Sequence, residues 1–267
     1  MMNNRTRLLQ YAISAAVAGG NVLRAHGDDA VHLRRRVKES TRDIATEVDD
    51  LAEKVAIERI RRFDAMPILA EESGASALID AAKDTFWAID PLDGTVNYVH
   101  HLPWYAVSIA YIEKGEPIVG VVYNPFLNEL YYGAEGTGAF KNHKRISVAE
   151  SPAQQSLCAI TFSGKKYGNQ HAEEFESFRK LNDETAGCLR TGSAALNLAY
   201  VAEGRLGGAC GRYSRLWDVA AGFVVAKEAG ASVTYEFAEP AAYLVHYAVG
   251  VSSLTDFLKS AAQMQGN

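Results

Sequence analysis

Apolar residues near the N-terminus recur mostly three and four positions apart, the spacing of one face of an amphipathic helix. This spacing predicts a helix over 5–25 and a second helix over 43–64. The basic segment between them is expected to be a solvated loop, and it contains Arg34, Arg35, Arg36 and Lys38. The first part of the chain is therefore predicted to be helical.

From Pro67 onward the apolar residues form short runs bounded by glycine or proline, which is typical of β-strands. The expected strands are 67–70, 85–89, 105–112, 118–123 and 129–132. Turn residues such as Asn124 and Pro125 then favour an antiparallel meander over 117–140.

The rest of the chain alternates between the two patterns. Strands are expected at 157–161, 208–210, 231–235 and 247–251, and helices at 171–182, 193–203, 218–229 and 253–263. This alternation predicts a layered α/β fold with a mixed sheet. With 267 residues and no linker or repeat, we expect one compact unit made of an N-terminal half, 1–150, and a C-terminal half, 151–267.

Composition narrows the class of protein. Lys and Arg number 27 against 32 Asp and Glu, so neither nucleic acid nor a membrane surface is an expected partner. No apolar run approaches the roughly 20 residues of a membrane span. A signal peptide is also not expected, because Gln10, Tyr11 and Ser14 interrupt the apolar run. The cysteines are three, without a CxxC pair, so we expect a cytoplasmic protein without disulfides.

Three acidic clusters lie near the ends of predicted strands or the head of a predicted helix. They are Glu71-Glu72-Ser73-Gly74, Asp90-Pro91-Leu92-Asp93-Gly94-Thr95 and Trp217-Asp218. Taken alone, each has an ordinary structural interpretation, respectively as a solvated loop, a turn and a helix N-cap. Their combination indicates something more specific.

The second cluster holds two carboxyl groups close together, because a predicted strand runs directly into Asp90 and Asp93 follows three residues later. Such charges repel unless a cation lies between them, and a set of oxygen donors suits magnesium. Gly94 and Thr95 then offer backbone N–H groups at a predicted helix start, where phosphate is attracted. Together these features indicate metal-assisted phosphoryl chemistry.

An aspartyl-phosphate mechanism is the main rival, since Leu92-Asp93-Gly94-Thr95-Val96 is similar to half of that phosphatase motif. The nucleophilic aspartate would lie two residues before Asp93, and that position is Pro91. Direct attack by a metal-activated water is therefore favoured over a phospho-enzyme.

The same residues resemble the inositol monophosphatase family of magnesium-dependent, lithium-sensitive phosphatases. Order and spacing agree through most of the chain. The matching segments are Lys38 with Asp43 to Asp49, Ile68 to Ser73, Trp87 to His100, Leu189 to Ala195, Trp217 to Gly222 and Glu228 to Gly230. The WAIDPLDGTVN string in the third segment is highly specific to this family.

The resemblance implies an αβαβα sandwich of the inositol monophosphatase and fructose bisphosphatase type. It implies that magnesium ions are held by Glu71, Asp90, Asp93, Asp218 and the Leu92 carbonyl. It further implies that the attacking water lies at Glu71 and is polarised by Thr95 and Asp49, which makes these three the expected catalytic residues.

The substrate-binding residues that the resemblance implies are Asp93, Gly94, Thr95 and Ala194. One departure concerns substrate choice. Inositol-selective members carry a glutamate that grips sugar hydroxyls seven residues before the Trp-Asp aspartate, whereas this chain has Gly211, followed by Arg212 and Arg215. These two arginines are candidates for binding a second phosphate or a carboxylate.

The resulting hypothesis is a magnesium-dependent phosphomonoesterase that acts on small polyol or sugar phosphates, with inositol monophosphate as the default. Alternatives are the related activities on fructose bisphosphate, a nucleotide 3′-phosphate, NADP or histidinol phosphate. A further alternative is a binding protein of the transcription machinery, as some bacterial relatives are. The resemblance also implies a homodimer.

Overall fold

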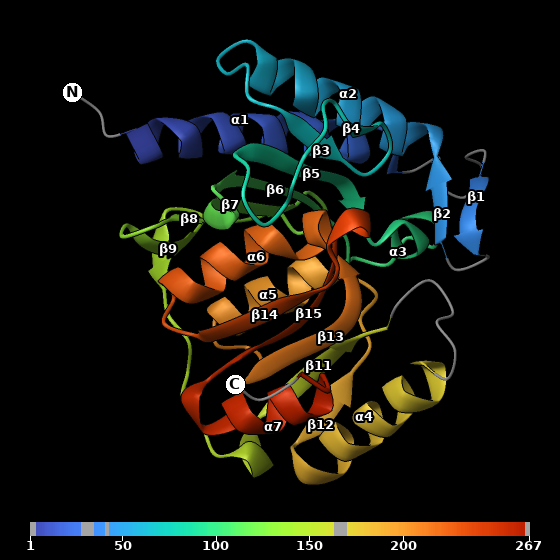
Figure 1. Ribbon diagram of the computed structural model, residues 1–267. Coiled ribbons are helices and arrows are strands. Elements are labelled where there is room, and N and C mark those ends of the chain that lie inside the picture. The colour runs from blue at the N-terminus through green and yellow to red at the C-terminus, as the bar shows by residue number, and fades with distance from the viewer. Residues whose placement is uncertain (1–3, 28–34, 41–42, 163–169, 265–267) are drawn as a thin grey trace.

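The computed structural model describes residues 4–27, 35–40, 43–162 and 170–264 (Figure 1). The helices are α1 (Asn4–Ala25), α2 (Glu47–Arg61), α3 (Thr95–Val99), α4 (Gln170–Glu184), α5 (Ala194–Ala202), α6 (Leu216–Glu228) and α7 (Thr255–Ala261). The strands are β1 (Arg35–Ser40), β2 (Asp43–Thr46), β3 (Ile68–Ala70), β4 (Gly74–Ala75), β5 (Phe86–Asp93), β6 (Ala106–Glu113), β7 (Glu116–Asn124), β8 (Glu129–Ala134), β9 (Gly138–Lys141), β10 (Lys144–Ile146), β11 (Leu157–Thr161), β12 (Gly187–Leu189), β13 (Gly208–Arg215), β14 (Ser232–Glu239) and β15 (Leu244–Gly250).

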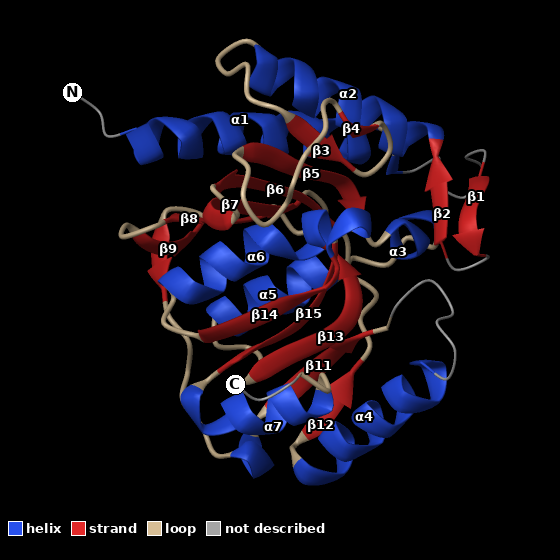
Figure 2. Cartoon of the chain, viewed as in Figure 1, coloured by secondary structure: helices blue, strands red, loops and turns tan. Residues whose placement is uncertain are grey.

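Five layers of secondary structure stack on one another (Figure 2). An eight-stranded sheet, in the order β10-β9-β8-β7-β6-β5-β3-β4, lies between the α1/α2 pair and the α5/α6 pair. A five-stranded sheet, in the order β12-β11-β13-β15-β14, lies between α5/α6 and the outer helices α4 and α7. The expected αβαβα sandwich is confirmed.

Helix α6 lies in the central layer, and its composition explains that position. Its sequence, LWDVAAGFVVAKE, is apolar around most of the helix circumference. Exposing any face of such a helix to solvent is unfavourable, so a position between two sheets is favoured. On one side its backbone lies directly on β7, because a Cβ atom added to Gly120 would lie only 2.2 Å from the Ala221 carbonyl oxygen. Glycine on the strand therefore permits an approach of backbone to backbone that no other residue allows.

The N-terminal part of the chain differs from the prediction at two segments. The expected basic loop contains strand β1, which pairs antiparallel with β2, and Arg34 lies outside the described residues. The expected helix over 43–64 begins only at Glu47, because Thr46 caps it through a capping box with Asp49. Pairing between the strands therefore prevails over the helical spacing in 43–46.

Most other predicted elements are confirmed, and the meander expected over 117–140 corresponds to strands β7, β8 and β9, each antiparallel to the next. The short strands β4, β10 and β12 were not predicted as elements, and α3 was predicted only by its start. Strand β13 runs beyond the expected 208–210 through a register shift between Gly211 and Ser214. Within the residues that the structure describes, no helix is long and apolar enough to cross a membrane.

Candidate active site

Strand β5 carries two of the predicted acidic residues to the carboxyl end of a fully buried strand. Asp90 pairs with Ser108 of β6 and Asp93 pairs with Ala106. An advance of three residues along β5 therefore corresponds to an advance of two residues along β6, which is a β-bulge. Such a bulge lets two side chains that would otherwise alternate turn to the same side. The Leu92 amide donates to Asp90 Oδ1 at 2.9 Å, which fixes the backbone between them.

The remaining predicted acids approach Asp90 from two other elements. Glu71 follows β3, and its side chain is hydrogen-bonded to that of Asp90. Asp218 lies in the first turn of α6. Burial, and then the charges on Glu71, Asp218 and Asp93, raise the pKa of Asp90 well above its usual range. The structure thus brings together four acidic side chains from three separate segments of the sequence.

Asp93 is held by the start of α5. Its Oδ2 atom accepts hydrogen bonds from Ser193 Oγ at 2.5 Å and from the Ala195 amide at 2.7 Å. Burial raises the pKa of Asp93 to about 7, although the Ser193 hydroxyl and the Ala195 and Ala194 amides act in the opposite direction. Ala194, a predicted substrate contact, therefore lies beside this carboxyl group.

Asp49 and Thr95 form the second predicted pair. The Thr95 hydroxyl can donate to Asp49 Oδ1 at 3.0 Å or to the Leu92 carbonyl at 3.1 Å. Asp49 is fully buried, and its other oxygen accepts from the Thr46 amide at 2.9 Å and the Thr46 hydroxyl at 2.5 Å. Both side chains are consequently fixed beside the end of β5, with Thr95 aligned by Asp49.

Gly94 connects β5 to the short helix α3. Its φ of 97° is in the left-handed region, and a Cβ atom there would lie 2.7 Å from the Trp104 carbonyl oxygen. Only glycine satisfies both constraints. The next residue, Thr95, begins α3, so the expected helix start is confirmed, although the helix has only five residues.

The chemistry of the donors fits magnesium better than a softer metal. Glu71, Asp90, Asp93, Asp218 and the Leu92 carbonyl offer oxygen atoms only. As the side chains stand, no three His, Cys, Asp or Glu residues of the described ranges already surround one point. The hydrogen bond between Glu71 and Asp90 needs a proton shared by the two carboxyl groups, and a cation bound between them would displace that proton.

No side chain occupies the predicted hydroxyl-gripping position. A Cβ atom on Gly211 would lie 2.6 Å from the Tyr247 ring and 2.9 Å from Ser214 Oγ. The Tyr247 hydroxyl is in turn hydrogen-bonded to Thr161 at 2.7 Å. The aromatic ring therefore fills the space in which a side chain at position 211 would begin.

The two candidate arginines are bound to different elements. Arg212 forms an ion pair with Glu173 of α4. Arg215 donates to the Ala242 carbonyl at 2.9 Å, and its guanidinium lies 5.5 Å from the centre of the Trp217 ring. Arg215 is also the N-cap residue of α6, within one turn of Asp218.

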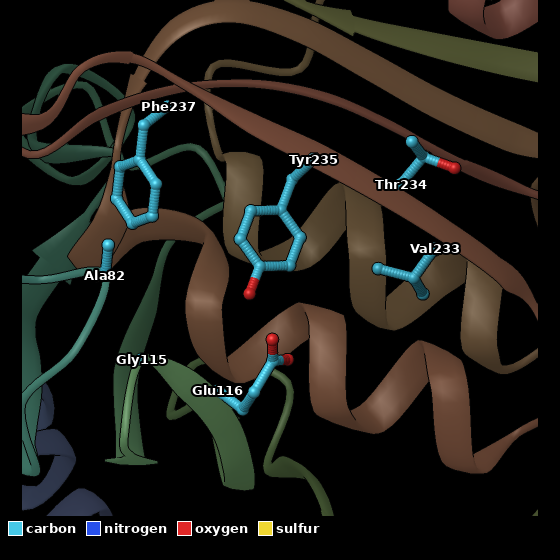
Figure 3. Close-up of a pocket in the computed structure, with 7 residues that line it drawn as sticks. All are labelled: Ala82, Gly115, Glu116, Val233, Thr234, Tyr235 and Phe237. Atoms are coloured by element: carbon cyan, nitrogen blue, oxygen red, sulfur yellow. The ribbon is translucent and has the colours of Figure 1, made fainter. Parts of the chain in front are cut away.

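Figure 3 shows a pocket of about 340 Å³ between β14 and the turn that joins β6 to β7. It is lined by Ala82, Gly115, Glu116, Val233, Thr234, Tyr235 and Phe237. The hydroxyl of Tyr235 and the carboxyl group of Glu116 point toward each other and are hydrogen-bonded. None of the predicted site residues lines this pocket.

The sequence interpretation gave no role to Ser193. A signal was present, because a serine directly before a helical apolar run is a common N-cap. Ser193 does cap α5 by accepting from the Leu196 amide at 3.2 Å. Its bond to Asp93 depends on tertiary structure and could not be inferred from local sequence.

Comparison with known proteins places this chain in a family of phosphatases. Over residues 4–265 the chain matches the inositol monophosphatase family, and it belongs to that family. Members of this family are generally metal-dependent.

Two curated relatives have different names. A fructose-1,6-bisphosphatase/inositol-1-monophosphatase of Thermotoga maritima is 36% identical over 85% of this chain and 84% of its own length. The Nus factor SuhB of Escherichia coli is 39% identical over the same shares of the two chains.

Solved structures agree with the fold throughout the chain. The inositol monophosphatase of Anabaena (Nostoc) superposes with a TM-score of 0.82 at 36% identity, covering 99% of this chain and 98% of that one. The extragenic suppressor protein SuhB of Bartonella henselae gives a TM-score of 0.84 at 29% identity, covering 97% and 100%.

Proposed function

We propose that this protein is a magnesium-dependent phosphomonoesterase that hydrolyses small polyol or sugar phosphates. The observation that carries the proposal is the convergence of Glu71, Asp90, Asp93 and Asp218 in a buried site, where burial and then the neighbouring charges raise the pKa of Asp90. A divalent cation would relieve this repulsion, and a phosphate ester needs such a cation to neutralise its charge.

The metal sites would be formed by these four carboxyl groups and the Leu92 carbonyl. Magnesium bound there would supply Lewis-acid stabilisation of the phosphoryl oxygens and a more acidic water. Glu71 is the proposed ligand nearest the attacking water. The remaining chemistry belongs to the protein's own groups.

Thr95 and Asp49 would orient the attacking water. When the Thr95 hydroxyl donates its proton to Asp49, at 3.0 Å, its oxygen lone pairs are free to accept a hydrogen bond from water. The amides of Gly94 and Thr95 would bind the phosphate, while Asp93 and the Ala194 backbone would contact the alcohol part of the substrate. Because Pro91 replaces the nucleophilic aspartate of the rival motif, the proposed reaction has no phospho-enzyme.

Substrate selectivity is proposed to be broad. Gly211 provides no acceptor for a sugar hydroxyl, and the Tyr247 ring covers its position. A site without a buried hydrogen-bonding partner discriminates weakly among alcohols. Inositol monophosphate is the default substrate, and fructose bisphosphate, a nucleotide 3′-phosphate, NADP and histidinol phosphate are the alternatives.

We also propose a cytoplasmic homodimer. Leu102, Trp104, Phe126 and Leu127 are each between 42% and 58% exposed, which is unusual for large apolar side chains. Their two segments are joined, because Asn124 Nδ2 donates to the Pro103 carbonyl at 2.7 Å. Three free, buried cysteines are in keeping with a reducing compartment.

A second candidate function is binding to the transcription machinery, which is favoured by relatives named Nus factor SuhB. It would be tested by measuring binding to purified bacterial RNA polymerase and Nus factors. If such binding is the function, it should not need the metal, so excess chelator should leave the binding unchanged.

The decisive test of the phosphatase proposal is phosphate release from a panel of inositol, sugar and nucleotide phosphates, with magnesium and with excess chelator. Asp93→Asn should abolish turnover, because one fewer negative charge weakens metal binding. Asp84→Asn, at an exposed position, is the matched control and should retain full activity. Release by Asp93→Asn at the wild-type rate, or in chelator, would disprove the metal mechanism.

A further inference from the structure

Helix α2 carries a second buried acid, one turn after Asp49. Glu53 is only 3% exposed, and it lies on the buried face of the helix with Val48, Ala52 and Ala56. Two carboxyl groups four residues apart on a helix disfavour each other, so an acid here needs partners that offset its burial.

Both oxygen atoms of Glu53 are occupied by backbone amides of one loop. Glu53 Oε2 accepts from the Glu72 amide at 2.7 Å, and Oε1 accepts from the Ser73 amide at 2.8 Å. Hydrogen bonds to a carboxylate are about twice as strong as those between neutral groups. The side chain of Glu53 therefore clamps two consecutive peptide units.

The clamped loop directly follows the predicted ligand Glu71. On the other side of that residue, the Glu71 amide donates to the Ile89 carbonyl at 3.1 Å, one residue before Asp90. The backbone of Glu71 is thus held between β5 and Glu53. Without the carboxylate of Glu53, these two amides would need other acceptors, and the loop would be able to adopt another conformation.

We propose that Glu53 is a positioning residue that fixes the loop 71–73 so that the Glu71 carboxyl group meets Asp90 in a geometry able to bind magnesium. This inference rests on the proposed metal-dependent function. Glu53 itself touches neither metal nor substrate. Helix α2 then supports both sides of the site, since Asp49 aligns Thr95 and Glu53 aligns Glu71.

The test compares Glu53→Gln with Glu58→Gln, which changes an exposed glutamate on the same helix. The glutamine amide keeps one acceptor but places an N–H₂ group against the second backbone donor. Magnesium alone is titrated into each protein by calorimetry, and thermal unfolding is followed in chelator. The magnesium dependence of kcat and KM is measured in parallel.

Loss of an outer hydrogen-bonding partner typically weakens metal affinity about 10- to 100-fold, and we expect this for Glu53→Gln. The magnesium concentration for half-maximal activity should rise by the same factor, while kcat at saturating magnesium largely recovers and KM for substrate is unchanged. Glu58→Gln should match the wild type. Unchanged magnesium affinity in Glu53→Gln, with or without a lower Tm in chelator, would overturn the positioning role.

If Glu53→Gln does not fold, Glu53→Asp replaces it, because aspartate keeps both acceptors on a side chain one methylene shorter. Weaker magnesium binding by that variant supports the proposal, and wild-type binding overturns it. A wild-type protein that binds no magnesium contradicts the proposed function itself. A magnesium-binding wild type with an unaffected variant contradicts only the role of Glu53.

Discussion

Ser193 Oγ donates to Asp93 Oδ2 at 2.5 Å and so joins two residues that are 100 positions apart in the chain. The same hydroxyl oxygen accepts from the Leu196 amide and caps α5. Ser193 therefore has two roles. It caps the N-terminus of α5, and it orients the carboxyl group of Asp93 at the end of β5. Because Oδ2 of Asp93 is held by Ser193 and the Ala195 amide at the start of α5, the orientation of Oδ1 is fixed as well.

Ser193→Ala is therefore expected to weaken magnesium binding about 10- to 100-fold, as loss of an outer partner of a metal ligand does. Calorimetry with magnesium alone would measure this. Ser177→Ala is a matched control, because it also removes a buried hydroxyl, one that donates to the Ala261 carbonyl at 2.7 Å in a distant part of the fold. Equal magnesium affinity in the two variants would contradict the assignment.

Thr95→Ala should lower kcat roughly 100-fold or more while changing KM little, since the proposed task of the hydroxyl is to orient water in the transition state. Thr95→Ser keeps the hydroxyl and should retain most of the activity. Steady-state kinetics on inositol monophosphate would show the difference. A labelled phospho-enzyme trapped by acid quench would instead contradict direct attack by water.

Lithium is expected to inhibit the magnesium-activated enzyme at saturating substrate. A small monovalent ion bound at Asp93 and Asp218 would provide less charge to the leaving oxygen than magnesium does. Phosphate release would be measured against lithium concentration, with sodium as the control salt. Full activity in lithium would show that the site formed by these two acids differs from the one proposed.

Arg215 is expected to favour substrates with a second anionic group. Arg215 is the N-cap residue of α6, within one turn of Asp218, whereas Arg212 forms its ion pair with Glu173 of α4. Arg215→Ala should lower kcat/KM for fructose bisphosphate about tenfold or more, the value of a charge-assisted hydrogen bond. Inositol monophosphate should be affected less, and Arg212→Ala should change neither. A strong preference for inositol monophosphate that neither substitution alters would refute this role.

Magnesium should stabilise the fold more at high pH than at low pH. In the folded, metal-free protein burial raises the pKa of Asp93 to about 7, from an ordinary value of 3.8. Between these values the unfolded chain releases the proton and the folded chain retains it, so the free energy of unfolding falls as the pH rises. Magnesium binds the deprotonated groups and reverses this loss.

The measurement is the difference in Tm between magnesium and chelator at about pH 8 and about pH 5, which lie above and below the pKa of about 7 that burial gives Asp93 in the folded chain. We expect a larger difference at the higher pH, and a smaller one at both in Asp93→Asn. If the Tm difference between magnesium and chelator does not change with pH, magnesium binding is not linked to the deprotonation of Asp93, and the prediction is wrong.

The sequence was most informative where the chemistry is local. The strand that ends in Asp90 and Asp93, and the helix start after Gly94, follow from apolar runs, proline and glycine within ten residues. The segment 43–46 was predicted wrongly, because helical spacing cannot reveal a partner strand such as β1. Strand pairing is decided by tertiary contacts that local propensity does not include.

The supporting residues were harder to foresee. Glu53 is an acidic residue at a position of α2 where the helical spacing predicts an apolar residue. This departure indicates that Glu53 has a specific role, but it does not indicate which role. Its partners lie about 20 residues away and depend on how the loop after β3 folds back. The surroundings of Gly211 were also hidden, because the Tyr247 ring reaches it from the neighbouring strand β15.

The contact between Gly120 and Ala221 affects how the protein tolerates mutation. Because α6 contacts β7 through main-chain atoms at this point, no side chain lies between the two elements one turn after Asp218. The contact therefore sets the gap between α6 and the eight-stranded sheet in the part of the helix that carries Asp218. Exchange of Gly120 for alanine, one methyl group, would widen that gap at once.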